Sequence, residues 1–228
     1  MSQRMALVVV LGAAGLASNG SAAVIDITSG TVTMAQLVGN SFIVGDKEFF
    51  VDFYTPFNIP ANQVTIRPVD FGLNGIGFDL VGAWNDVPGD ASSTGFDLGY
   101  RVQVRAPFVA QGFRIVDAHL AFNGSASGPG SFSKVAESMF NQANGAPLGN
   151  MLVTANGGVP QGEWVLNQNI VFAPVIEVNV VKNFQLFANG ANGTANASFI
   201  RQTFSQIPTP GGVTLLGLAG LAAARRRR

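Results

Sequence analysis

The sequence predicts an all-β domain, an antiparallel β-sandwich or jelly roll, with an N-terminal signal helix and a short C-terminal hydrophobic helix. Three observations support this prediction. Between residues 24 and 204, apolar residues alternate with polar or small ones over short runs, which is the period of a strand with one buried face. Clusters of Gly, Asn, Pro and Ser separate the runs. Each end of the chain carries an uncharged apolar stretch beside basic residues.

Nine runs are strand-like by this period. In the run at residues 100–106, for example, Val102 and Val104 alternate with Arg101, Gln103 and Arg105. The two sets therefore face opposite sides of a sheet. A segment that overlaps the sixth run, residues 135–143, could instead form a short helix. The nine runs are residues 48–54, 63–71, 75–84, 100–106, 113–122, 132–140, 163–172, 175–188 and 197–204.

The breaks between the runs have a chemical reason. Gly and Asn accept positive φ in tight turns, and Pro fixes φ, so clusters of these residues end strands. Nine strands with one apolar face each are buried most simply by packing two sheets together. The predicted turns are residues 85–95, 123–131, 141–150, 155–162 and 188–196.

Composition bounds the class of protein. A chain of 228 residues with no linker-like segment is expected to hold one core. Five of its 13 basic residues are Arg4 and the four C-terminal arginines, so eight basic residues accompany all 13 acidic ones in the middle. This acidic balance argues against a nucleic-acid partner. The absence of cysteine excludes disulfides and thiol chemistry.

The first 23 residues have the layout of a secretory signal peptide. Arg4 precedes an apolar stretch over residues 5–16, and a small-residue tract ends at Ala23. We expect signal peptidase to cut between Ala23 and Val24.

The last 23 residues, 206–228, look like a second targeting segment. Residues 211–224 are uncharged and span about 21 Å as a helix, short of a hydrocarbon core of about 30 Å. A cluster of positive charge after an apolar segment resists translocation and stays on the cytoplasmic side. That cluster is Arg225, Arg226, Arg227 and Arg228.

This tail resembles the PEP-CTERM sorting signal of exported bacterial proteins, which an exosortase recognises and cleaves. Pro208, Thr209 and Pro210 match its short motif, residues 211–224 its helix, and the arginines its basic cluster. Thr209 stands where the family usually has glutamate, which leaves open which processing enzyme reads the motif. Segments of the middle, such as residues 44–49, 61–69, 115–131 and 178–190, are similar to an ectodomain that recurs among PEP-CTERM proteins and has no assigned activity.

Few residues suggest chemistry. His119, the only histidine, is two residues from Asp117, so both lie on one face of a strand and can pair. Asp86 and Asp90 stand in an acidic, glycine-containing stretch with the character of a calcium loop, although the spacing does not match an EF-hand. A solvated acidic turn is the alternative.

Aromatic residues offer a binding surface or a core. Trp84 and Tyr100 could stack on sugars if exposed, or pack inside a sandwich. A secreted hydrolase would need two carboxylates facing each other across a cleft. No motif points to an enzyme, and no cofactor is expected unless calcium binds.

Together these patterns predict residues 1–23 as signal peptide, 24–205 as a β-sandwich ectodomain and 206–228 as a sorting signal. The expected function is that of an exported cell-surface or extracellular-matrix protein without enzymatic activity. Its expected partners are signal peptidase, an exosortase-type enzyme, the inner membrane transiently through the C-terminal helix, and extracellular polysaccharide. A carbohydrate-binding module, with calcium as an added ligand, is the alternative function.

Overall fold

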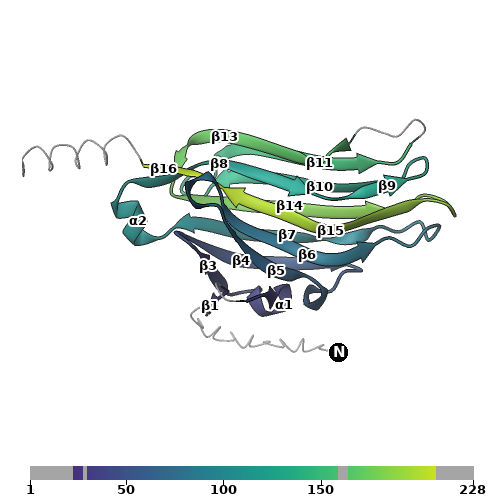
Figure 1. Cartoon of the computed structure of the whole chain (residues 1–228), viewed down its shortest axis with the longest axis horizontal. Coiled ribbons are helices and arrows are strands. Elements are labelled where there is room, and N and C mark those ends of the chain that lie inside the picture. Colours follow the sequence, from purple (N-terminus) through teal and green to yellow (C-terminus); the bar gives the residue numbers. More distant parts are fainter. Residues whose placement is uncertain (1–22, 28–29, 159–163, 209–228) are drawn as a thin grey trace, which may run out of the picture.

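A computed structural model describes residues 23–27, 30–158 and 164–208, and these form two β-sheets packed against each other (Figure 1). The strands of the first, sheet A, are antiparallel except where β1 pairs β3 in parallel. In spatial order sheet A contains β1 (Val24–Asp26), β3 (Ser41–Val44), β4 (Lys47–Phe57), β7 (Thr94–Val104), β14 (Glu177–Phe187), β10 (Phe132–Asn141), β11 (Pro147–Asn156) and β12 (Trp164–Val165).

Sheet B covers the inner face of sheet A. Its strands, in spatial order, are β13 (Asn167–Val175), β8 (Phe113–Phe122), β15 (Thr194–Phe204), β6 (Ile76–Asn85), β5 (Thr65–Asp70) and β2 (Val32–Thr33). Two short strands extend it: β16 (Gln206–Pro208) pairs β8, and β9 (Ser125–Ser127) pairs β15.

The short helices lie in the connections. Thr33 and Gln36 form a capping box at α1 (Met34–Leu37), and α2 (Ala106–Ala110) joins β7 of sheet A to β8 of sheet B. Two 3-10 turns, η1 (Ala61–Gln63) and η2 (Gly72–Asn74), flank β5. Between β3 and β4 the chain reverses at Gly45, whose φ of 56° favours glycine.

Aromatic rings from both sheets fill the space between them. Phe184 of sheet A lies 5.1 Å from Trp84 and 6.5 Å from Phe122, both of sheet B, measured between ring centroids. Nearer the other end, Phe49 of sheet A meets Phe78 of sheet B edge to face at 5.3 Å. These inter-sheet contacts establish the β-sandwich that alternation predicted.

The predicted strand positions are largely confirmed. The run at 113–122 coincides with β8, and β4, β5, β6, β7, β10, β14 and β15 each overlap their predicted run. Val102 and Val104 are buried, as the alternation required, while Arg101 and Gln103 face outward.

Two predictions of secondary structure were wrong, and one alternative is excluded. Residues 135–143 do not form the alternative helix, because most of them belong to β10, paired on both sides by β11 and β14. The turn predicted at 141–150 ends early, since β11 starts at Pro147. The run at 163–172 is divided between β12 and β13, which lie in different sheets.

The predicted signal helix and C-terminal hydrophobic helix fall within residues 1–22 and 209–228, outside the described residues. In the part of the chain that is described, no helix has the length and apolar character needed to cross a membrane.

The ring cluster yields a test of the core. We expect Phe184→Ala to lower the free energy of unfolding by about 3 to 5 kcal/mol, because it removes a fully buried ring that contacts Trp84, Phe96 and Phe122. Chemical denaturation measures this. The control is Phe187→Ala on the same strand, where the ring is only partly buried and a smaller loss is expected. Equal losses would contradict the assignment of Phe184 to the core.

Candidate functional site

The aromatic ligand candidates are buried. Trp84 is 4% exposed and Tyr100 is 1% exposed, and both belong to the core between the sheets. Neither ring can stack on a sugar from solvent, so of the two alternatives that the sequence offered, the structure supports the core and excludes the ligand role. The inward positions of β6 and β7, which alternate with outward polar residues, account for this burial.

The acidic stretch does not converge on one point. Asp86 is buried and accepts a hydrogen bond from the Ala188 backbone N–H at 2.8 Å, which ties the loop after β6 to the end of β14. Asp90 is exposed and accepts one from the Ser92 N–H at 3.0 Å. Within the described residues, no three His, Cys, Asp or Glu side chains gather in the manner of a metal site. Asp86 and Asp90 therefore each hold a separate backbone N–H in the structure.

Asp117 and His119 pair as predicted, with His119 Nε2 lying 3.2 Å from Asp117 Oδ1. The same nitrogen is 3.5 Å from Ser205 Oγ. A catalytic relay needs the carboxylate on one ring nitrogen and the serine on the other. Here both use Nε2, and Asp117 also accepts the Ser205 backbone N–H at 2.9 Å. This trio fastens the end of β15 to β8 and lacks the arrangement of a triad.

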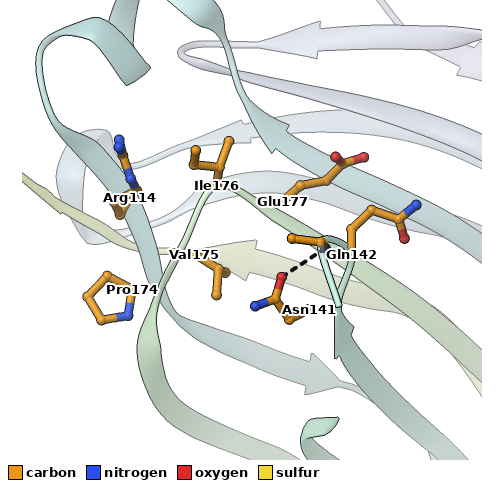
Figure 2. Close-up of a pocket in the computed structure, with 8 residues that line it drawn as sticks. Arg114, Asn141, Gln142, Pro174, Val175, Ile176 and Glu177 are labelled. Atoms are coloured by element: carbon orange, nitrogen blue, oxygen red, sulfur yellow. Dashed lines mark hydrogen bonds between the residues drawn. The ribbon is translucent and has the colours of Figure 1, made fainter. Parts of the chain in front are cut away.

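A pocket of about 480 Å³ opens where β10 and β13 end (Figure 2). Arg114 and Glu177 supply its charged groups, and Glu177 also pairs with Arg101 at 3.3 Å. Glu177 is the single carboxylate among the lining residues, so this pocket lacks the two opposed acids of a glycosidase. The remaining lining residues are Asn141, Gln142, Ala143, Pro174, Val175 and Ile176.

The outer face of sheet A carries an exposed phenylalanine ring that covers a glycine of the neighbouring strand. Phe53 is paired in register with Gly99, and a Cβ on that glycine would lie 2.0 Å from the Phe53 ring. The ring therefore lies across the glycine, and 41% of Phe53 remains exposed. Beside it, Asn183 donates to Asp97 at 2.6 Å, and Arg101 lies 4.7 Å from the centroid of the Phe50 ring. This surface, the Phe53 face, combines an apolar plane with amide, carboxylate and guanidinium groups.

The outer face of sheet B is held by an Arg67, Asp79 and Arg201 ladder across β5, β6 and β15, three residues in register. Asp79 accepts from Arg67 at 2.7 Å and from two nitrogens of Arg201 at 2.7 and 3.0 Å. Burial alone would raise the pKa of Asp79, but the hydrogen bonds and charges of Arg201 and Arg67 outweigh it and hold the pKa below its usual value.

Charged residues also lie between the sheets, at positions that no motif in the sequence marks. Lys182 of β14 and Lys47 of β4 are both fully buried. Each reaches from sheet A to the side-chain carbonyl of a glutamine on the sheet B side: Gln202 at 2.9 Å and Gln206 at 2.7 Å. Both lysines stand in phase with buried apolar residues of their strands, a signal that alternation could have revealed.

The predicted processing positions lie at the rim of the fold. Ala23 and Val24 are exposed beside β3, and Pro208 ends β16. Thr209, Pro210 and Arg225 to Arg228 lie outside the described residues.

No protein-family model matches the chain, and no curated protein matches it. Among solved structures, it is similar to the isomalto-dextranase of Arthrobacter globiformis T6 in complex with panose, at 14% identity and a TM-score of 0.27, covering 68% of this chain and 23% of that one. The chain is also similar to the enzymatically active domain of tailspike protein 4 of bacteriophage CBA120, at 12% identity and a TM-score of 0.29. This match covers 72% of this chain and 20% of that one.

The carbohydrate-binding module TmCBM27, studied for mannan recognition, gives 13% identity and a TM-score of 0.27, covering 68% of this chain and 98% of that one. The chain thus spans less than a quarter of the length of the first two structures. At these TM-scores the likenesses carry no argument about function.

The ladder on sheet B makes a pH-dependent prediction. Because the folded-state pKa of Asp79 is lowered, its stabilisation is present above the unfolded value of about 3.9 and is lost as pH falls through the folded value. We expect Asp79→Asn to cost about 2 kcal/mol at pH 7. The difference in free energy of unfolding between the variant and the wild type should become smaller below about pH 4. Chemical denaturation at several pH values measures this difference. Asp90→Asn, at an exposed turn, is the control. A gap independent of pH would refute this role.

Proposed function

We propose that the protein is an exported, non-enzymatic β-sandwich of the bacterial cell surface or extracellular matrix, processed at both ends. Signal peptidase would cut between Ala23 and Val24. An exosortase-type enzyme would recognise Pro208, Thr209 and Pro210 while the apolar segment and arginine cluster hold the tail in the inner membrane.

The observation that carries this proposal is the extent of the core. Among the described residues, the hydrophobic core runs from Ile27 to Phe204, between the two predicted cleavage positions. β1 is an edge strand of sheet A, and Ile207 of β16 is 46% exposed. Cuts after Ala23 and near Pro208 would therefore leave the described core residues, and the Gln206 contact with Lys47, in the mature chain.

The arginine cluster provides the test. Replacing Arg225, Arg226, Arg227 and Arg228 by Asn removes the charges that resist translocation. We expect unprocessed protein in the medium, measured by fractionation and immunoblotting of the producing cell. Lys134→Asn, a charge change on the outer face of sheet A, is the control and should sort normally. Normal sorting of the four-arginine variant would contradict the proposal.

A second proposal concerns what the mature domain contacts: the Phe53 face binds extracellular polysaccharide. An exposed ring that covers Gly99 can stack on the apolar side of a sugar. Asn183, Asp97 and Arg101 beside it supply donors and acceptors for hydroxyl groups.

We expect Phe53→Ala to weaken binding to the producing cell's own polysaccharide by about 3- to 10-fold, because it removes the stacking ring. Affinity electrophoresis in gels containing that polysaccharide measures the change. Phe71→Ala is a matched control, since Phe71 is 55% exposed near Arg201 on the opposite sheet. Equal binding of the polysaccharide by the Phe53→Ala variant and the wild type would contradict the proposal.

A further inference from the structure

Glu137, Lys182 and Gln202 form a polar cluster between the two sheets, here called the inter-sheet cluster. Glu137 of β10 and Lys182 of β14 are direct register partners in sheet A, and Gln202 lies opposite on β15 of sheet B. Each is at most 2% exposed. Lys182 Nζ contacts a carboxylate oxygen of Glu137 and lies 2.9 Å from Gln202 Oε1. One amine, one acid and one primary amide thus meet out of reach of bulk water.

Burial changes the protonation of this cluster. It lowers the pKa of Lys182, against the opposing charge and hydrogen bond of Glu137. It also raises the pKa of Glu137, against the opposing charge of Lys182 and the favourable interactions of Lys182 and the Gln202 side chain with the carboxylate. Both shifts act in the direction that moves the proton from the ammonium to the carboxylate. A neutral amine is the nucleophilic form of lysine.

The cluster is also incompletely hydrogen-bonded. Within the described residues, the second carboxylate oxygen of Glu137, the side-chain nitrogen of Gln202 and the hydroxyl of Tyr100 are buried without a hydrogen-bond partner. Buried polar atoms of this kind are costly and are uncommon in folded proteins. Two of these atoms belong to Glu137 and Gln202, the side chains that Lys182 Nζ contacts, and they call for an explanation beyond packing.

We propose that Lys182 and Gln202 react to form an intramolecular isopeptide bond that joins sheet A to sheet B, with Glu137 transferring the proton. The Gln202 carbonyl carbon is one C=O bond, about 1.2 Å, from the oxygen that Lys182 already contacts, so a small side-chain rotation brings it to the amine.

The reaction balances without a cofactor. Neutral Lys182 Nζ attacks Gln202 Cδ, and a new N–C bond forms. Protonated Glu137 gives its proton to the departing side-chain nitrogen of Gln202, so the Cδ–Nε2 bond breaks and ammonia leaves. Glu137 then takes the surplus proton from Lys182 Nζ and returns to its starting state. One amine and one primary amide become one secondary amide and one ammonia.

The second buried lysine provides an internal comparison. Lys47 Nζ lies 2.7 Å from Gln206 Oε1 and 3.1 Å from Asp46. Burial lowers the pKa of Lys47, but three carboxylates, Asp46, Asp70 and Asp117, oppose that effect and favour the charged ammonium. At Lys182, Glu137 is the one carboxylate among the described residues that opposes the lowering of the pKa. We therefore expect the bond at Lys182 and not at Lys47.

The test is peptide mapping of the full chain, purified from an expression host and read by mass spectrometry. The expected result is an intact mass about 17 Da below the calculated value, from loss of one ammonia. A tryptic digest should contain a linked pair of peptides, uncut at Lys182 and joined to the peptide that starts at Gln202. The linked pair decides, because succinimide formation at an Asn-Gly pair also removes ammonia.

Variants assign the roles. Glu137→Gln keeps the shape of the side chain but cannot transfer the proton, so the linked peptide should disappear. Lys182→Met should also abolish it, and Lys47→Met, at the comparison site, should leave it unchanged. Absence of the linked peptide from the wild-type chain would overturn the proposal without reference to any variant. A link mapped to Lys47 and Gln206, or a loss of about 18 Da joining Lys182 to Glu137, would overturn it as well.

Discussion

Packing of aromatic rings between the two sheets is the interaction on which the rest of the structure depends. The chain has no cysteine, so no disulfide holds the sheets together. Phe184, Trp84 and Phe49 link sheet A to sheet B through ring contacts that span the core. Because inward positions are given to these rings, alternate residues must face solvent. Phe53 departs from this series: Phe49 and Val51 of the same strand point inward, and the irregularity in register between Val51 and Phe53 turns the Phe53 ring to the outer face.

The two buried lysines, Lys47 and Lys182, oppose the stability that the core provides. Taking an ammonium and a carboxylate out of water costs several kcal/mol per ion, which their attraction recovers only with good geometry. An apolar residue at position 182 would avoid the cost, and the proposed bond gives the buried amine a use. Conversion to an amide would remove both the buried charge and the need to solvate it, and would supply the covalent link that cysteine does not.

Alternation predicted the sandwich and most of its strands, because a two-residue period with regular turn clusters leaves little choice of fold. It failed at β11, where Gly149 and Asn150 look like turn residues but are held in the sheet by β10. It also failed to decide whether Trp84 and Tyr100 were core or surface, since aromatic rings suit both. The inter-sheet cluster depends on which strands become neighbours. Lys182 in phase with Val180 and Phe184 gave a local signal, but only the fold brings Gln202 opposite.

Intact-mass spectrometry of the chain recovered from the surface and medium of the producing cell tests the proposed sorting most directly. A species that starts at Val24 and ends near Pro208 is the predicted result, and it would establish that the chain is cut at both predicted positions. A species that retains Arg228 would contradict it. In that case the tail would be a permanent or unused segment, and the likeness to a sorting signal would have no functional meaning.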